Sequence, residues 1–193
     1  MHPFFIFSII YEKGFDEISE GRARPGHFRG VATIVNKLFN IIQPTNVYFG
    51  QKDAAQCVLI RRMVHDLDMD INVCVMDTIR EKDGLAMSSR NAYLNAEERK
   101  AAVILYQSLC AAKNMFDNMV SATHGDKTLS ASVLKEKVME VLTSEKLVSN
   151  VQYVSVDSKE TMRPLETVSA EEGAIVSIAC QVGSVRLIDN FVL

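Results

Sequence analysis

The sequence predicts an α/β chain in two parts, a parallel α/β piece followed by a small α+β domain. Three observations carry this prediction. Patterns typical of helix, strand, helix and strand follow one another between residues 28 and 78, the order of a parallel sheet. Further helical patterns and then several β-type runs follow. The 193 residues are 48% hydrophobic and 23% charged, which is ordinary for a globular protein of one large or two small domains.

The first part contains four predicted elements. Apolar residues recur at helical spacing up to Pro44, and a short β-type run ends at Gly50. A second helical pattern begins near Asp53, and an apolar β-type run follows it. The elements are a helix over 28–43, a strand over 46–49, a helix over 53–67 and a strand over 71–78.

The second part begins after a polar loop. Asn95 and Glu98 are spaced as a capping box that opens a helix running to about Phe116. A linker-like stretch separates this helix from the next, and β-type runs fill the end of the chain. The predicted elements are a linker over 121–130, a helix over 131–145 and strands over 151–156, 174–182 and 185–193. We expect one domain over residues 1–95 and a second over 96–193.

Composition argues against several classes of function. The net charge of −3 gives no reason to expect a nucleic-acid surface. The opening MHPFFIFSII is too short to span a bilayer and lacks the features of a signal peptide, so we expect a buried strand or a stray start there. Four scattered cysteines show no metal-ligand spacing, and we expect small buried side chains in a reducing compartment. They are Cys57, Cys74, Cys110 and Cys180.

The segment Gly50-Gln51-Lys52-Asp53, with Gln56, lies where a predicted strand gives way to a helix. Ligands of open α/β sheets bind at the carboxyl ends of strands. A helix N-terminus there offers N–H groups and a positive dipole to an anion, and Lys52 adds a full charge. The competing interpretation is a plain turn in which Asp53 caps the helix and Lys52 is solvated.

The loop KDGLAMSSRN, residues 82–91, follows the next predicted strand. Ser88 and Ser89 supply hydroxyls, and Arg90 supplies a bidentate fork for phosphate oxygens. Gly84 would let the loop bend as a lid does. The competing interpretation is a solvated surface loop with serine turns.

A third polar segment, RARPGHFRG at residues 22–30, leads into the first helix. Arg24 is a candidate partner for a carboxylate or phosphate. His27 has no carboxylate or nucleophile near it in sequence, so we interpret it as a structural cap or a packed ring.

Four stretches together resemble the pantothenate synthetase (pantoate–β-alanine ligase) family. They are RPGHFRGVATIVNKLFNIIQP, VYFGQKDAAQCVLIRRMV, IREKDGLAMSSRNAYLNAEER and the terminal RLIDN, so that the resemblance runs from about Gly21 to Asn190. It implies part of a Rossmann-like nucleotidyltransferase domain followed by a small C-terminal domain, in a cytoplasmic homodimer. It also implies an ATP-dependent ligase that joins pantoate and β-alanine through pantoyl adenylate, with Mg²⁺ brought by ATP.

The resemblance also implies roles for single residues. It places Ser88, Ser89, Arg90 and Lys52 on the ATP phosphates as the residues that support catalysis. It lines the remainder of the ATP site with Gly50, Gln51, Asp53, Ile79 and Met87. It assigns Gln56, and less directly Arg24, to pantoate. The loop over 82–91 matches the family's counterpart of a synthetase KMSKS loop.

One family feature is missing from this sequence. The family opens with a βαβ segment that carries paired histidines in an H-x-G-H type motif, and no such pair occurs here. The opening residues MHPFFIFSIIYEKGF show no recognisable match to that segment. We therefore expect the chain to correspond to the family's C-terminal two thirds, as an N-terminally truncated ligase. The alternative is a non-catalytic nucleotide-binding or dimer-partner protein derived from the family.

Overall fold

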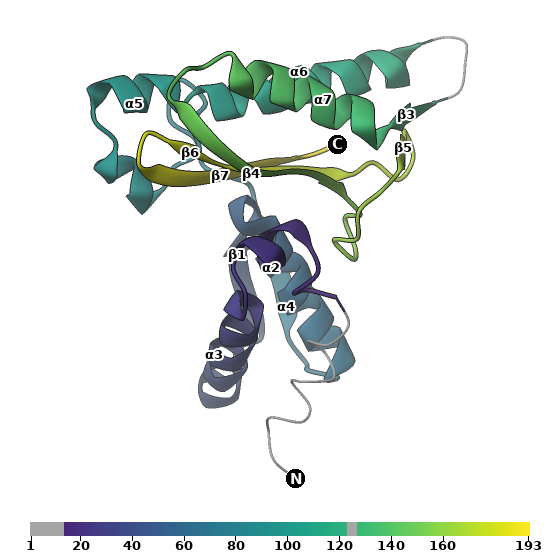
Figure 1. The fold of residues 1–193 in the computed structure, drawn as a ribbon. Coiled ribbons are helices and arrows are strands. Elements are labelled where there is room, and N and C mark those ends of the chain that lie inside the picture. Colours follow the sequence, from purple (N-terminus) through teal and green to yellow (C-terminus); the bar gives the residue numbers. More distant parts are fainter. Residues whose placement is uncertain (1–13, 123–126) are drawn as a thin grey trace. The chain divides into compact units, whose positions relative to one another are not determined.

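The computed structural model describes residues 14–122 and 127–193, and the chain divides into two compact units (Figure 1). The division lies between Asp77 and Thr78, earlier than the boundary expected after residue 95. The reason is that the polar loop and the short η2 helix (Ser89–Tyr93) belong with the strands at the end of the chain. Arg80 forms an ion pair with Asp189, and η2 lies against the last strand. The expected strand over MHPFFIFSII lies outside the described residues.

The N-terminal unit has the predicted parallel α/β pattern. Its elements are α2 (Ser19–Ala23), α3 (His27–Ile42), β1 (Asn46–Gly50), η1 (Gln51–Asp53), α4 (Ala54–Asp66) and β2 (Asn72–Met76). Strands β1 and β2 pair in parallel, with Val47 opposite Val73. A crossover through α4 joins them, as parallel neighbours require. The helix–strand–helix–strand prediction is confirmed.

The two long helices of this unit differ in how much of their apolar surface is covered. Helix α4 buries most of one side, including Leu59, Ile60 and Met63, none of which is exposed. Helix α3 buries Phe28, Ala32 and Phe39, but a row of its apolar residues is exposed. The row comprises Ile34, Leu38, Ile41 and Ile42, with Ile41 exposed to 78%. The described part of the unit therefore covers only a fraction of the apolar face that the sequence predicts.

The C-terminal unit packs helices on one face of an antiparallel sheet (Figure 1). After η2 its elements are α5 (Ala96–Ala101), α6 (Ile104–Ser121), β3 (Thr128–Ser130), α7 (Ala131–Thr143), β4 (Val148–Asp157), β5 (Thr167–Ser169), β6 (Ile175–Val182) and β7 (Val185–Val192). The sheet has the order β4-β6-β7, and β3 pairs with β5. Leu109, Leu134, Val138 and Ile178 are fully buried between the helices and the sheet.

Several local predictions for this unit need correction. The helix expected from Asn95 to Phe116 is two helices, α5 and α6, which meet at Ala102 and Val103. No glycine or proline marks that break, so the sequence carries no stop signal there. Strands β3 and β5 were not predicted because three residues are too few for alternation to show. The expected linker over 121–130 contains β3, and its residues 123–126 lie outside the described part.

The four cysteines differ in how deeply they are buried. Cys57 and Cys180 are buried, but Cys74 and Cys110 are only half-buried, so the expectation of four buried thiols is wrong. Cys74 lies on β2, where every residue is half-buried or exposed.

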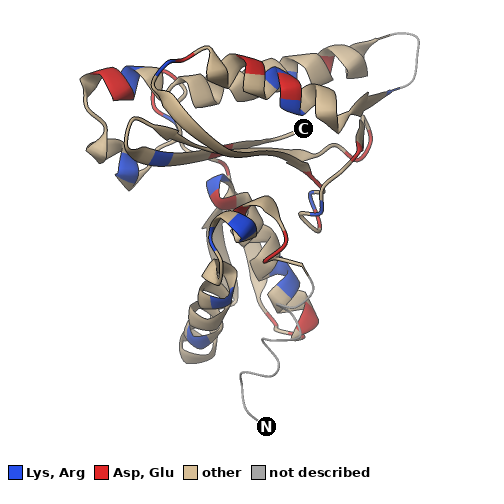
Figure 2. Ribbon diagram, viewed as in Figure 1, with Lys and Arg blue, Asp and Glu red and all other residues tan. Residues whose placement is uncertain are grey.

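Acidic and basic residues lie next to one another on α7 (Figure 2). Within the described residues, no helix has the length and apolar character needed to cross a membrane.

Candidate nucleotide-binding site

The end of strand β1 carries the first group of predicted site residues. The strand stops at Gly50, η1 forms one turn over Gln51–Asp53, and α4 begins at Ala54. Gly50 is exposed, and a Cβ built on it would meet no atom within 4 Å, so the backbone is open to close approach. Asp53 stands at the N-cap position of α4 but makes no side-chain cap hydrogen bond. The competing interpretation of Asp53 as a capping residue is therefore wrong.

The thiol of Cys57, on helix α4, forms a hydrogen bond with the last residue of strand β1. Its Sγ donates to the carbonyl oxygen of Gly50 at 3.3 Å. Burial, and then the charge of Asp53, raise the pKa of Cys57 to about 11. The thiol therefore keeps its proton at neutral pH and remains a donor. Lys52 and Gln56 are half-buried in the same segment, with Gln56 three positions after Asp53 on α4.

Arg24 and His27 contact each other before helix α3. Nη1 of Arg24 lies 3.0 Å from Nε2 of His27 and 3.4 Å from a carboxylate oxygen of Glu20. Because arginine only donates, the His27 nitrogen is the acceptor. The His27 ring lies 5.3 Å from the Phe28 ring. Gly26, with a φ of 76°, occupies the N-cap position of α3, so His27 is a packed ring and not a cap.

The second group of site residues lies on a hairpin-like loop at the start of the C-terminal unit. Arg80 and Ala86 form an antiparallel bridge, and the N–H of Met87 donates to the carbonyl of Ile79 at 2.9 Å. Ile79 and Met87 are exposed to 68% and 51%. The second arm of the loop runs directly into Ser88. Two apolar side chains are thus held open to solvent immediately beside the serines.

Ser88 is the N-cap residue of η2, and Ser89 and Arg90 are its first two residues. The backbone N–H of Arg90 donates to Oγ of Ser88 at 3.2 Å, so the serine turn of the competing interpretation is present. This contact leaves the Ser88 hydroxyl hydrogen available to donate. Ser89 and Arg90 are exposed. Within residues 14–122 and 127–193, no side-chain hydrogen bond or ion pair involves the Arg90 guanidinium.

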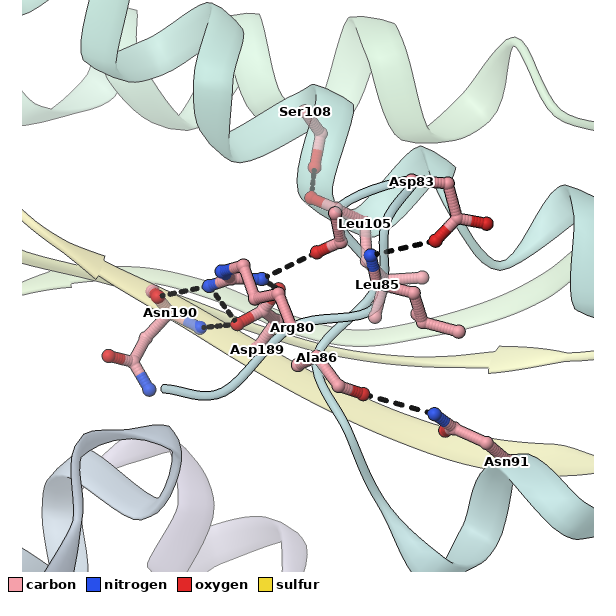
Figure 3. Close-up of polar contacts among 10 residues, drawn as sticks. Arg80, Asp83, Leu85, Ala86, Asn91, Leu105, Ser108, Asp189 and Asn190 are labelled. Carbon is pink, nitrogen blue, oxygen red and sulfur yellow. Dashed lines mark hydrogen bonds and ion pairs between the residues drawn. The ribbon is translucent and has the colours of Figure 1, made fainter. Parts of the chain in front are cut away.

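Two ion pairs that sequence reasoning missed support this loop. Arg80 pairs with Asp189 of strand β7, and Asp83 pairs with Arg99 of α5 (Figure 3 draws the first pair). The hydrogen bond from Arg99 holds the pKa of Asp83 below its usual value. Asp189 belongs to the RLIDN stretch that carried part of the resemblance, and that stretch was the available signal. Gly84 is buried with a φ of 94°, and packs closely against Tyr106 instead of serving as an open hinge.

The predicted residues therefore fall into two groups, one in each unit. Arg24, Gly50–Asp53 and Gln56 belong to the N-terminal unit, and Ile79–Arg90 belong to the C-terminal unit. In the described part of the chain, no cluster of three or more histidine, cysteine or acidic side chains could hold a metal ion. Both groups instead offer cations, hydroxyls and backbone N–H groups, which are ligands for phosphate.

Strand β1 ends at a glycine, and a lysine follows at the start of the next helical turn. This arrangement is typical of α/β proteins that bind phosphate groups, and the serine–arginine turn of the second unit offers further phosphate ligands. Comparison with known proteins narrows this class. The family model for Pantoate-beta-alanine ligase matches residues 1–192. The chain belongs to the pantoate–β-alanine ligase family.

Curated relatives agree with the family assignment. The chain is 47% identical over all its 193 residues to a pantothenate synthetase of Chloroflexus aggregans, of which it covers 66%. It is 45% identical to the pantothenate synthetase of Thermotoga neapolitana, of which it covers 65%. The chain thus spans a little under two thirds of the length of these relatives.

Solved structures confirm the fold class. A pantothenate synthetase from Thermus thermophilus matches 89% of this chain with a TM-score of 0.79 at 39% identity, and 58% of that protein is covered. A pantoate-beta-alanine ligase from Francisella tularensis matches 96% of this chain with a TM-score of 0.62 at 29% identity, and 61% of it is covered. The Francisella protein is complexed with Beta-gamma ATP and beta-alanine.

The comparisons correct one expectation about the start of the chain. The resemblance was placed from Gly21 onward, with no recognisable match before it. The family match begins at residue 1, and the aligned region of the Chloroflexus relative covers the whole chain. The opening residues are mostly apolar and carry no polar motif of the kind that identifies the remainder, so sequence reasoning found no match there.

Proposed function

We propose that this chain functions in the ATP-dependent condensation of pantoate with β-alanine, which yields pantothenate, AMP and pyrophosphate. The observation that carries the proposal is the family match over residues 1–192, which includes both groups of candidate site residues. The curated relatives named pantothenate synthetase, and the family structure complexed with Beta-gamma ATP and beta-alanine, support it further.

The reaction has two steps. A carboxylate oxygen of pantoate attacks the α-phosphorus of ATP, and the bond to pyrophosphate breaks. The amine of β-alanine then attacks the carbonyl carbon of pantoyl adenylate, and AMP leaves. In the first step negative charge accumulates on the departing pyrophosphate, and preorganised donors stabilise such charge.

The loop of the C-terminal unit is suited to that task. We assign the Arg90 guanidinium to a bidentate contact with phosphate oxygens, and the hydroxyls of Ser88 and Ser89 to single hydrogen bonds. The exposed Ile79 and Met87 beside them are suited to apolar contact with the nucleotide. Mg²⁺ would arrive with ATP and neutralise part of the phosphate charge.

The strand end of the N-terminal unit supplies the remaining contacts of the proposal. Lys52 and the N–H groups near Gly50 and Gln51 are assigned to ATP phosphate, with Asp53 lining the same segment. Gln56, in the first turn of α4, offers a neutral donor and acceptor to the pantoate hydroxyl or carboxylate. Arg24 is assigned to pantoate as well, on the family resemblance; its guanidinium lies 3.4 Å from a carboxylate oxygen of Glu20, and pantoate would have to share or replace that contact.

We also propose that the protein is a cytoplasmic homodimer. The exposed apolar row Ile34, Leu38, Ile41 and Ile42 supports self-association, because contiguous apolar surface of this kind marks interaction sites. Light scattering on the purified chain tests the proposal. A mass of one chain across micromolar concentrations would contradict it.

The test of function is a product assay with matched variants. Purified chain is incubated with ATP, Mg²⁺, pantoate and β-alanine, and pantothenate and AMP are measured together. We expect both products in equal amounts. We expect Arg90→Ala and Lys52→Ala to lower turnover by roughly 10²-fold each, as the loss of one charge-stabilising donor does. Arg163→Ala and Lys37→Ala are the controls, since both remove an exposed cation elsewhere in the same units.

The outcomes separate the candidate functions. Product formation that falls only in the Arg90 and Lys52 variants supports the ligase with the phosphates placed as assigned. Wild-type turnover in both variants would mean that the phosphates lie elsewhere. If no product forms, Mg-ATP binding is measured by calorimetry, and binding without any product would favour the non-catalytic nucleotide-binding alternative.

A further inference from the structure

A buried ion pair lies directly behind the loop that carries Ser88–Arg90. Nη1 and Nη2 of Arg80 donate to the two carboxylate oxygens of Asp189, at 2.6 and 2.9 Å (Figure 3). The Asp189 side chain is 1% exposed and that of Arg80 18% exposed. Such a two-pronged contact fixes direction as well as distance. The plane of the Arg80 guanidinium is therefore set by a residue of strand β7.

Two aromatic rings hold the guanidinium in place. The Cζ atom of Arg80 lies 4.9 Å from the ring centre of Tyr106 on α6 and 5.0 Å from that of Phe191 on β7. The two rings pack edge to face, with centres 5.7 Å apart. An arginine over aromatic faces gains cation–π attraction and loses water. The guanidinium therefore has one position available.

Arg80 also contacts the loop backbone, so its fixed position constrains the loop. Its Nη1 also donates to the carbonyl of Gly84 at 3.0 Å, across the turn of the hairpin. Ladder contacts from Glu81 N–H to the Leu85 carbonyl, and from the Asn91 side chain to the Ala86 carbonyl, continue this order toward η2. Figure 3 shows Arg80 between Asp189 and the loop backbone. The three residues after Met87 follow an arm whose path is fixed by these contacts.

The ion pair is a costly way to stabilise a core. Replacement of a buried ion pair by well-packed apolar residues is often neutral or stabilising, whereas removal of one partner is strongly destabilising. What the pair offers beyond stability is orientation, because apolar contacts have no preferred direction. A loop that must present two hydroxyls and a guanidinium to one set of phosphate oxygens needs that orientation.

We propose that Arg80 and Asp189 are positioning residues for the phosphate-binding loop. They touch no substrate themselves. They hold the hairpin so that Ser88, Ser89 and Arg90 are preorganised for the β- and γ-phosphates of ATP. This inference rests on the proposed function for the identity of the ligand, but the anchoring of the loop is measurable without any ligand.

The experiment compares four forms of the full chain: wild type, Asp189→Asn, Arg80→Lys and Asp117→Asn. Asp117→Asn is the matched control, because it removes a carboxylate from a partly exposed ion pair with Lys113 in the same unit. Two quantities are measured at a temperature where all four are folded. One is hydrogen–deuterium exchange at the amides of residues 81–91. The other is the affinity for Mg-ATP and for AMP, by calorimetry.

We expect Asp189→Asn to speed exchange in residues 81–91 and to weaken ATP binding about tenfold or more, the value of one charge-assisted hydrogen bond. Arg80→Lys keeps the charge without the fork, and we expect it to fall between Asp189→Asn and wild type. AMP lacks the β- and γ-phosphates but keeps the apolar contacts assigned to Ile79 and Met87, so we expect its affinity to fall less than that of ATP in each of the two loop variants. A purely structural role would weaken both nucleotides alike, and would overturn the inference.

The remaining outcomes are also decisive. Exchange in residues 81–91 that matches wild type in Asp189→Asn would overturn the anchoring itself. If wild type and Asp189→Asn bind ATP with equal affinity, the positioning role is overturned and the proposed function is left intact. No ATP binding by wild type would overturn the proposed function and the nucleotide part of the inference, and the exchange data would then decide the anchoring separately.

Discussion

Replacement of Gly84 by alanine tests how tightly the phosphate-binding loop is packed. Gly84 has a φ of 94°, which side chains with a Cβ rarely adopt, and a Cβ there would overlap the Tyr106 ring. The ring has little room to swing away, because Arg80 stacks on it and Phe191 packs against it. Backbone strain costs about 1–3 kcal/mol and overpacking costs about the same, so we expect a loss of roughly 2–6 kcal/mol in the free energy of unfolding.

Differential scanning calorimetry measures this loss. For a unit of this size about 1 kcal/mol corresponds to roughly 4 °C, so the transition of the C-terminal unit should fall by about 8 °C or more. Gly30→Ala is the control, because a Cβ there meets open space within helix α3. That change should raise stability by about 0.5–1 kcal/mol. A Gly84→Ala transition within about 2 °C of wild type would refute the packing argument.

Three further predictions concern other contacts. Asn95→Ala removes the capping box that Asn95 shares with Glu98, and should lower the free energy of unfolding, measured in urea, by about 1 kcal/mol. Asn95→Asp keeps an oxygen that can cap the helix, so it should lose much less. An equal loss in both variants would contradict a capping role. Asp83, whose pKa is lowered by Arg99, should add stability that is fully present above about pH 4, the unfolded value, and is lost as pH falls through the lower folded value. The difference in melting temperature between wild type and Asp83→Asn should therefore be present at pH 7 and vanish in acid, and a difference unchanged at about pH 2 would contradict this. Iodoacetamide reacts with the thiolate form of cysteine, and the pKa of Cys57 is raised to about 11. Cys57 should therefore resist labelling at about pH 8 until the protein unfolds. Fast labelling of the folded protein, detected by mass spectrometry, would contradict its burial.

Much of the fold follows from local signals in the sequence. Helix α3 ends where Pro44 forbids its continuation, and the capping residues Asn95 and Glu98 open α5 as predicted. Gly173 and Gly183 adopt the positive φ values, 64° and 58°, that their place beside the last strands suggests. Such signals act over a few residues, so a single sequence displays them.

The contacts that hold the site together are not local. Nothing near Arg80 indicates a partner 109 residues away, and nothing near Gly84 indicates the Tyr106 ring that requires a glycine. The serines and arginine of the loop were identified from their chemistry and from the family resemblance. Their support was not, because ion pairs and ring stacking depend on how distant segments meet. The same limit explains why Asp53 was considered as a cap, since its geometry is set by the η1 turn before α4.

The distance along the chain between Arg80 and Asp189 has a consequence for biosynthesis. Strand β7 follows every other described element in the sequence, and Asp189 comes 109 residues after Arg80. Contacts between segments so far apart form late, because a long loop must close first. While the polypeptide is still emerging from the ribosome, the hairpin at residues 79–87 therefore lacks its anchor. A frameshift that replaced only the residues from Asp189 onward would remove the support of a loop encoded more than a hundred codons earlier.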